Sequence, residues 1–344
     1  MFNILFILRI DAKEKNGGDL FQAKQYQRVL QEQLPDMINI KYAHDITKNE
    51  LETTTWDLVE LFNVSRLDEH MFYLKSITYK NIIMTPVVQP GYLYNFKDYI
   101  KSFIRGLFKF KYLSYNTIEK KHALLSKCLF NVYLSHDEQL YYEKNFVKTP
   151  KSILVHNGID KDLPSIEEKN NKEIDFLIVG RIEKSKNSLN TLELLNTHFP
   201  HLKTQFIGAG NKYHFRYFKK FLQKCAENEN ISYLGVKTHS EVLALMSNAK
   251  VLLNLSLKEV SPLVDLEALA CHMKVLSTTE SFTHLKENSC FMRVNPSHQT
   301  EIIKKINLIN KSHCESKKEI QVFSWEMTLK AYTEEIKILI QKEK

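Results

Sequence analysis

Two glutamates, Glu259 and Glu267, flank the start of a helix that the sequence predicts over residues 263–270. Glu259 follows an apolar run at 249–255 that predicts a strand, and Glu267 lies about one turn into the helix. The backbone N–H groups at the helix start belong to Ser261, Leu263 and Val264. A carboxylate on each side of such an anion-binding helix start can hold sugar hydroxyls while the N–H groups hold a phosphate. Glutamates at this spacing are also common by chance, so neighbouring motifs must decide between the two interpretations.

Two cations follow another predicted strand, at residues 175–179. Gly180 ends that strand, and Arg181 and Lys186 lie between it and a helix predicted over 189–195. Two fixed cations beside a helix N-terminus suit a diphosphate group. A solvated basic turn is the alternative interpretation of this loop.

The chain has only 9 glycines, where an average usage of about 7% would give about 24. Each is therefore informative, because glycine is the residue that allows left-handed backbone or a close backbone approach. Gly17 and Gly18 follow a strand predicted over 2–8 and open a helix predicted over 19–34. They can bring N–H groups to an anion, although no G-x-G-x-x-G occurs and a plain strand-to-helix turn is the simpler interpretation.

Predicted strands and helices alternate along the whole chain. The predicted strands lie at 2–8, 58–62, 82–88, 128–134 and 153–155, and then at 175–179, 203–207, 231–234, 249–255 and 274–277. This alternation predicts an α/β fold with parallel sheets and crossover helices, in two doubly wound domains joined around the charged stretch 161–172. Ligands of such sheets bind beyond the carboxyl ends of the strands, where the loops described above lie.

The composition excludes several classes of protein. The 344 residues are 43% hydrophobic and 26% charged, which is typical of a globular protein of roughly two domains. No apolar run approaches the roughly 18 residues of a membrane span, and the run at 2–8 predicts a buried strand and not a signal peptide. The five cysteines form no C-x-x-C pair, which predicts reduced thiols and no cysteine-based zinc site.

The segment from Glu259 to Glu267 resembles the E-x7-E signature of retaining GT-B glycosyltransferases of family 4. Five further elements resemble that family's motifs in the family's order: V-H-N-G-I-D at 155–160, G-R with a lysine at 180–186, F-I-G-A-G at 206–210, Y-L-G-V at 233–236 and F-S-W-E at 323–326. They run from the end of the first domain to the last helix. The first 150 residues match the family only in their strand–helix pattern.

The resemblance implies the GT-B fold, which has two Rossmann-like doubly wound domains facing a cleft. Residues 1–163 would form the acceptor-binding domain and residues 164–322 the nucleotide-sugar-binding domain. Residues 323–344 would form a C-terminal helix that crosses back to the N-terminal domain.

The resemblance also implies roles for particular residues. Glu259 would contact the hydroxyls of the transferred sugar, Glu267 would hold the donor ribose, and Arg181 with Lys186 would neutralise the diphosphate. These cations would act in place of a metal, so no metal and no cofactor besides the nucleotide-sugar substrate is expected. The expected donor-binding set also includes Gly17, Gly18, Gly180, Gly208, Val236, Ser261, Leu263 and Val264. The chain departs from the family at Val260–Pro262, where relatives have glycines, and at Gln89, near which many relatives have a histidine.

Excess positive charge lies in two segments of the chain, residues 101–150 and 201–250, which carry a net +5 each. Residues 95–112 place Lys97, Lys101, Arg105 and Lys109 on one helical stripe beside an apolar face. Such a helix can lie on an anionic membrane surface, unless its apolar face is simply core. Residues 213–224 form a second aromatic and basic helix, and no nucleic-acid-reading motif accompanies either segment.

The resemblance, together with these features, implies a retaining, metal-independent glycosyltransferase. It would transfer a sugar from a nucleotide-diphosphate donor to a bacterial surface glycan or a lipid-linked acceptor. The expected location is the cytoplasm, as a peripheral protein on the inner face of the cytoplasmic membrane. Two alternatives keep the fold: a non-catalytic nucleotide-sugar-binding subunit of a glycan assembly complex, and a GT-B sugar-nucleotide epimerase.

Overall fold

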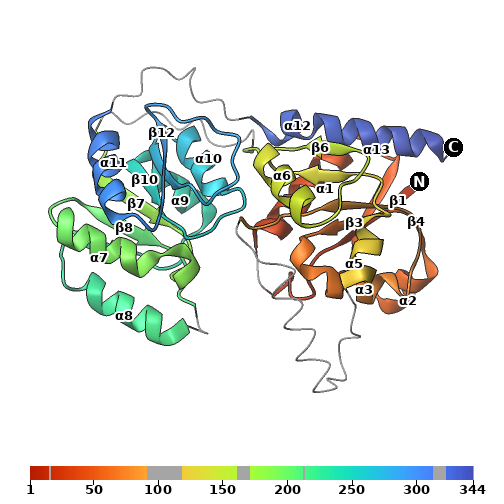
Figure 1. The fold of residues 1–344 in the computed structure, drawn as a ribbon, viewed down its shortest axis with the longest axis horizontal. Helices are drawn as coiled ribbons and strands as arrows, with labels where there is room; N and C mark the ends of the chain where they lie inside the picture. The colour runs from red at the N-terminus through yellow and green to blue at the C-terminus, as the bar shows by residue number, and fades with distance from the viewer. Residues whose placement is uncertain (15–16, 91–117, 161–170, 212–213, 313–322, 344) are drawn as a thin grey trace. The chain divides into compact units, whose positions relative to one another are not determined.

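The structure is a computed structural model that describes residues 1–14, 17–90, 118–160, 171–211, 214–312 and 323–343. The basic segment 95–112 lies outside the described residues. The chain divides into two compact units (Figure 1). Unit 1 contains Met1–Asn157 and Trp325–Lys344, and unit 2 contains Gly158–Ser324. Among the described helices, none combines the length and the apolar character needed to cross a membrane.

Unit 1 is built on a parallel six-stranded sheet of order β2-β1-β3-β4-β5-β6. Its strands are β1 (Phe2–Ile7), β2 (Ile38–Tyr42), β3 (Thr55–Phe62), β4 (Thr78–Thr85), β5 (Asn131–Tyr133) and β6 (Ser152–Leu154). Its helices are α1 (Gly18–Gln33), α2 (Lys48–Thr53), η1 (Val64–Arg66), α3 (Leu67–Leu74), α5 (Ile118–Leu125), α6 (His136–Asn145), α12 (Trp325–Thr328) and α13 (Lys330–Lys342).

The last two helices pack on unit 1 through buried side chains. Trp325 is fully buried, and its ring lies 6.3 Å from that of Phe21 on α1. Tyr332 of α13 donates a hydrogen bond to the buried carboxylate of Glu60 in β3. Figure 1 shows α13 running beside β6. The C-terminal segment is therefore an integral part of the unit that begins at Met1.

Unit 2 is built on a second parallel six-stranded sheet, of order β12-β11-β10-β7-β8-β9. Its strands are β7 (Ile174–Val179), β8 (Thr204–Ile207), β9 (Ile231–Tyr233), β10 (Ala249–Asn254), β11 (Lys274–Thr278) and β12 (Phe291–Val294). Its helices are η2 (Lys184–Lys186), α7 (Ser188–His198), α8 (Phe215–Cys225), α9 (His239–Ser247), α10 (Leu263–Ala270) and α11 (Gln299–Lys311).

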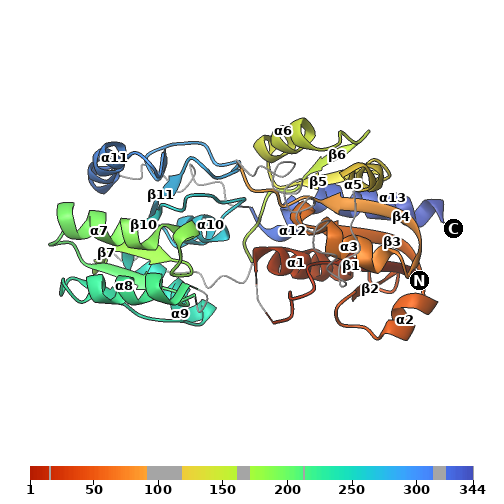
Figure 2. The ribbon, with the colours of Figure 1, turned by 60° about the horizontal axis from the view of Figure 1, so that its bottom comes forward.

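Helices cover both faces of the unit 2 sheet (Figure 2). One core cluster joins the sheet to α7, α8 and α11, and the other joins it to α9 and α10. The strands are buried on both faces, which is why they appear in the sequence as continuous apolar runs. The prediction of two Rossmann-like doubly wound domains is confirmed.

Some elements of the structure were not expected from the sequence patterns, namely β2, β12 and α11. The expectation that all five thiols are reduced is wrong for Cys290, which is disulfide-bonded. Three other cysteines are free and buried in the core: Cys128, Cys225 and Cys271.

Candidate functional site

The strand order of unit 2 reverses between β7 and β10, its two central strands. The chain moves from β7 to β8 and β9 on one side, and then returns to β10 on the other side. Such a reversal opens a crevice at the carboxyl ends of the two strands, and ligands of open α/β sheets bind there. Lys186 follows β7 and Glu259 follows β10, and the Lys186 ammonium donates a hydrogen bond to Glu259. Two of the residues predicted from sequence therefore meet at the switch point.

Backbone contacts hold Glu259 in this position. Its N–H donates to the carbonyl oxygen of Glu280 at 2.9 Å, and it forms a parallel bridge with Ser281. The N–H of Leu257 donates to the carbonyl oxygen of Ser185, also at 2.9 Å. The loop after β10 is thus tied to the loops after β11 and β7. The side chain of Glu259 is 12% exposed and that of Lys186 is 28% exposed, so a ligand can still reach both.

Glu183 is a carboxylate in the loop after β7 that the sequence analysis missed. It pairs with Arg181 at 3.0 Å and accepts hydrogen bonds from Ser185 Oγ and Asn211 Nδ2, each at 2.7 Å. Burial acts to raise the pKa of Glu183. The hydrogen bonds and the charges of Arg181 and Lys186 outweigh burial, and the pKa falls below its ordinary value. Glu183 is therefore an anion that holds the Arg181 loop and the Asn211 loop together.

Glu267 lies on α10 and is paired with a histidine that the sequence analysis also missed. His239 Nε2 lies 2.9 Å from Glu267 Oε1, and the pKa of His239 is raised mainly by this hydrogen bond. His239 is the first residue of α9. A capping box between Thr238 and Glu241 fixes the start of the helix at this position. The contact joins residues 28 positions apart, so it depends on the packing of α9 against α10 and not on local sequence.

Helix α10 begins at Leu263, as expected from the sequence. Pro262 is its N-cap, since the backbone of Pro262 is extended. Leu263 and Val264 then supply the first N–H groups, which have no acceptor inside a helix. Ser261 precedes the cap and is partly buried. The predicted anion-binding N–H groups are therefore placed at the switch point, directly after the loop that carries Glu259.

Beneath this helix start lies a buried carboxyl group, Asp265, that the sequence analysis did not single out. It accepts hydrogen bonds from Asn254 Nδ2, at 2.9 Å, and from Ser277 Oγ. Burial raises its pKa to about 7. Its contacts join the first turn of α10 to the ends of β10 and β11, so Asp265 fixes the position of the helix start. The sequence did contain a sign of this role. Asp265 lies four residues before the buried Leu269, so its carboxyl group is on the apolar side of the helix.

The predicted glycines after β7 and β8 touch each other. A Cβ atom on Gly208 would lie 2.0 Å from the carbonyl oxygen of Gly180, and Gly208 has a φ of +139°. Only glycine allows this close approach of the two loops. Val236, predicted to line the donor, follows Gly235 after β9 and is 72% exposed. These residues share the strand-end edge of the sheet with Glu259 and Lys186.

Gly17 and Gly18 belong to unit 1, whereas the other predicted donor-binding residues belong to unit 2. Gly17 is the N-cap of α1, where the carboxylate of Asp19 accepts a hydrogen bond from the Leu20 N–H. Arg9 pairs with Asp19 at 3.1 Å. The helix start therefore already holds an anion from the protein itself. Gln89, after β4, is exposed.

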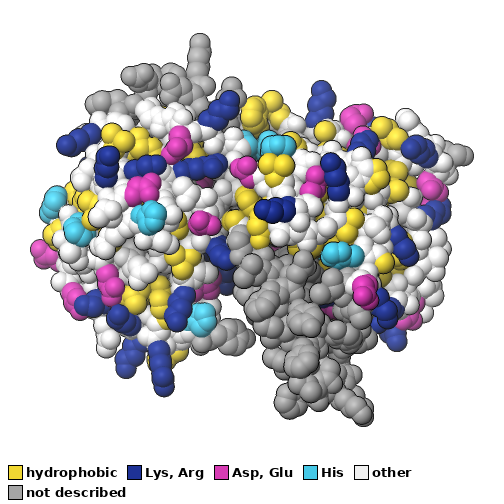
Figure 3. Space-filling view, in the orientation of Figure 1, with side chains coloured by type: hydrophobic (Ala, Val, Ile, Leu, Met, Phe, Trp, Pro, Cys, Tyr) yellow, Lys and Arg dark blue, Asp and Glu magenta, His cyan; other side chains and the backbone are white. Residues whose placement is uncertain are grey.

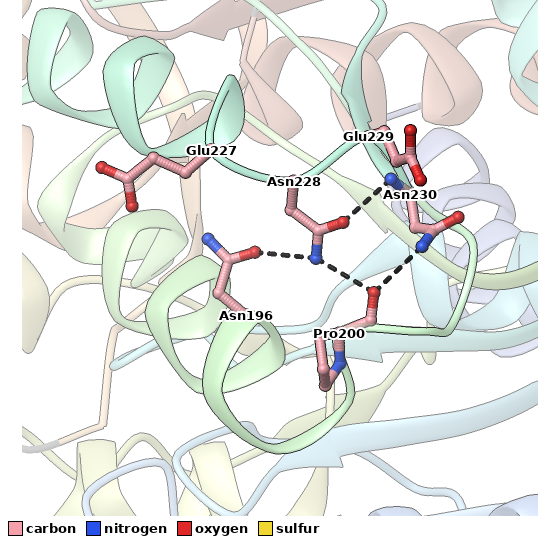
Figure 4. Close-up of a pocket in the computed structure, with 6 residues that line it drawn as sticks. All are labelled: Asn196, Pro200, Glu227, Asn228, Glu229 and Asn230. Carbon is pink, nitrogen blue, oxygen red and sulfur yellow. Dashed lines mark hydrogen bonds between the residues drawn. The ribbon is translucent and has the colours of Figure 1, made fainter.

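Unit 2 also has a surface hollow of about 650 Å³, whose lining differs chemically from the residues at the switch point (Figure 4). It is lined by Asn196, Pro200, Glu227, Asn228, Glu229 and Asn230. Asn228 and Asn230 directly precede β9, so the hollow lies at the amino ends of the strands, away from the switch point. Asn228 Nδ2 donates to Asn196 and to the carbonyl oxygen of Pro200, each at 3.1 Å. These amide groups satisfy one another and brace the α8–β9 turn.

No group of three or more His, Cys, Asp or Glu side chains within the described ranges is arranged to hold a metal ion. The polar groups gathered at the switch point are instead two cations, carboxylates and helix N–H groups. Such a set can bind an anion and the hydroxyl groups attached to it.

Residues 160–318 match the family model described as glycosyl transferases group 1. A search of curated protein sequences found no significant match. Solved structures do resemble the whole chain. Sucrose-phosphate synthase from Thermosynechococcus elongatus is 12% identical, with 99% of this chain and 100% of that chain covered and a TM-score of 0.72.

Two further solved structures are similar over the full length. HepE from Anabaena in complex with UDP is 12% identical, covering 99% of this chain and 98% of that chain with a TM-score of 0.62. The lipopolysaccharide outer core galactosyltransferase WaaB is 12% identical, covering 100% of both chains with a TM-score of 0.63. The chain thus has the fold of GT-B glycosyltransferases, and residues 160–318 are similar in sequence to glycosyl transferases group 1.

Proposed function

We propose that this protein is a retaining, metal-independent glycosyltransferase that uses a nucleotide-diphosphate sugar. The observation that carries the proposal is the Lys186–Glu259 pair at the switch point, directly before the start of α10. The match of residues 160–318 to glycosyl transferases group 1 supports it.

In this proposal the donor diphosphate lies between the cations and the first N–H groups of α10. Arg181 and Lys186 stabilise the negative charge that grows on the diphosphate as its bond to the anomeric carbon breaks. Because Lys186 turns to the diphosphate, Glu259 is released to accept hydrogen bonds from the sugar hydroxyls. Glu267 accepts hydrogen bonds from the ribose, which positions the nucleoside at the other end of the donor. The acceptor hydroxyl attacks the anomeric carbon, and its proton leaves with the diphosphate.

The acceptor we propose is a bacterial surface glycan or a lipid-linked precursor of one, bound by unit 1. The likeness to WaaB, a lipopolysaccharide galactosyltransferase by name, supports this class. The proposed location is the inner face of the cytoplasmic membrane, with residues 95–112 as a membrane contact. A uridine nucleotide is the first donor to test, since HepE was solved with UDP.

A panel of nucleotide sugars, screened by thermal shift and then by donor hydrolysis and transfer, tests this function. A bound donor raises the melting temperature by mass action. Glu259→Gln and Lys186→Ala should abolish most turnover, whereas Lys184→Ala is a matched control because Lys184 is an exposed cation of the same turn. Equal turnover in all three variants would refute the assignment. Activity should also survive a chelator, and the product should keep the donor's anomeric configuration.

The same screen separates the two alternatives. Donor binding without turnover on any acceptor would favour a non-catalytic subunit. Conversion of the donor without an acceptor, to an isomeric nucleotide sugar, would favour an epimerase.

A further inference from the structure

Helix α8 on unit 2 has an outer face that the proposed function does not use. Phe221 and Cys225 anchor the helix in the core. On the same helix the side chains of Phe215 and Leu222 are 65% and 40% exposed. These two apolar residues lie seven positions apart, which is two helical turns, so they project from the same side of α8.

The cations of α8 surround this apolar pair. Lys219 lies four positions after Phe215 and three before Leu222, and is exposed between them. Arg216 and Lys220 are exposed on the adjoining side of the helix. Figure 3 shows dark-blue side chains around yellow ones where α8 lies in Figure 1. No acidic residue occurs in α8, so every charged side chain of this helix is basic.

Neighbouring carboxylates neutralise only part of this charge. Lys220 pairs with Glu193 of α7 at 3.2 Å, and Lys224 pairs with Glu227 at 3.0 Å. Within the described part of the chain, no ion pair involves Arg216 or Lys219. The two cations beside the exposed apolar pair are therefore available to an external anion.

We infer that α8 docks unit 2 on an anionic lipid surface. Phe215 and Leu222 enter the acyl boundary, while Arg216 and Lys219 contact the lipid phosphates. A bilayer interface places an anionic layer directly beside an apolar layer, which matches cations and large apolar side chains that alternate along one helix. A nucleic acid would engage the cations and stack a base on Phe215, but it would leave the aliphatic side chain of Leu222 in water. This inference does not depend on the glycosyltransferase assignment, and it concerns helix α8 and not residues 95–112.

A tryptophan reporter tests the docking surface directly. The two native tryptophans, Trp56 and Trp325, are 1% and 0% exposed, so a new indole on the surface will be distinguishable. Phe215→Trp places it on α8, and Leu308→Trp on α11 is the matched control because Leu308 is 54% exposed on the same unit. Vesicles of brominated phosphatidylglycerol and phosphatidylcholine should shift the Phe215→Trp emission to the blue and quench it, and should leave Leu308→Trp unchanged. Equal behaviour of the two indoles, or no response at position 215, would overturn the inference even if the chain binds vesicles elsewhere.

Charge reversal gives a second test on the full chain. The double variant Arg216→Glu, Lys219→Glu should partition into anionic vesicles at least about tenfold less. Each basic side chain near an anionic surface contributes substantially to the free energy of membrane binding. Lys304→Glu with Lys311→Glu is the matched control, because both are exposed lysines of α11. Equal losses in the two double variants would mean a simple net-charge effect and no α8 surface. If the α8 variant loses binding to single-stranded nucleic acid and keeps its vesicle binding, the surface serves nucleic acid and the inference is wrong.

Discussion

The ammonium of Lys186 donates a hydrogen bond to the carboxylate of Glu259 across a separation of 73 residues. The contact spans the point where the sheet of unit 2 reverses its strand order. In this arrangement each group satisfies the hydrogen-bonding capacity of the other. A diphosphate and a sugar would each have to replace one half of the pair. Breaking the ion pair costs free energy, and only a ligand that replaces both halves of the pair offsets that cost. The pair would thus contribute to donor selection.

The first prediction separates the two halves of that pair. Lys186→Met should weaken binding of a nucleoside diphosphate by about tenfold to a hundredfold, because a charge-assisted hydrogen bond contributes about 1.5–3 kcal/mol. Glu259→Gln should instead strengthen binding of the diphosphate alone, since Lys186 is then released from its carboxylate. The same variant should bind and turn over the complete nucleotide sugar poorly. Calorimetry on both variants measures this, with Lys184→Met as the control. Weaker diphosphate binding in Glu259→Gln would contradict the model.

The second prediction concerns the protonation of His239. Its pKa is raised chiefly by the hydrogen bond to Glu267, so the pair is most stable below pH 6.5 and weakens as the pH rises through the raised pKa. A ribose that takes over Glu267 breaks the pair and returns the pKa of His239 toward 6.5. Nucleotide binding near neutral pH should therefore release protons. Calorimetry in two buffers of different ionisation enthalpy detects them, and Glu267→Gln should abolish the release. Unchanged release in that variant would assign the protons to another group.

The third prediction contrasts two glycines. Gly208→Ala should destabilise unit 2 by more than about 3 kcal/mol, because the new Cβ would lie 2.0 Å from the Gly180 carbonyl oxygen, at a left-handed φ of +139°. Gly18→Ala should be neutral or stabilise unit 1 by about 0.5–1 kcal/mol, since nothing lies within 4 Å of its Cβ position at the start of α1. Urea unfolding of the two variants measures both effects. A Gly208→Ala variant as stable as the parent chain would mean that the two loops separate easily.

Sequence patterns predicted the parts of the site whose signal is local. The strands of unit 2 are buried on both faces and form apolar runs, and α10 was predicted with its observed bounds, Leu263–Ala270. Strand β2 was missed because only alternate residues, Ile38, Ile40 and Tyr42, are buried in it. The spacing of Glu259 and Glu267 was visible in the sequence, and so were the cations after β7.

The contacts between these residues depend on strand order, which no local pattern contains. Lys186 meets Glu259 because β10 is placed beside β7 and not beside β9. His239 reaches Glu267 because α9 and α10 cover the same face of the sheet. Glu183 was hidden for the same reason, since its partner Asn211 follows a different strand. The sequence therefore identified residues, and the fold determined their partners.

The last prediction concerns Glu60, which joins β3 to the C-terminal helix α13. Burial raises its pKa to about 7, although Thr85 and Tyr332 donate hydrogen bonds to it. Because the native state then binds more protons than the unfolded chain between pH 4.5 and about 7, stability is full below that window and falls as the pH rises through it. The loss is on the order of 3 kcal/mol for a shift of this size. Glu60→Gln should remove this part of the pH dependence.

Tyr332→Phe tests the same junction from the other side. Removing the hydroxyl group leaves one oxygen of the ionised carboxylate without its donor. The free energy of unfolding of the variant should therefore fall by about 1–3 kcal/mol, and by more at pH 8 than at pH 5. Urea unfolding at the two pH values measures both variants, with Glu119→Gln as a control because Glu119 is exposed on α5 of the same unit. If Tyr332→Phe lost the same stability at both pH values, the hydrogen bond to Glu60 would not depend on the charge of the carboxyl group. The charge of Glu60 would then play no part in holding α13, whose other contacts with unit 1 include the buried side chain of Ile336 and the ion pair between Lys151 and Glu335.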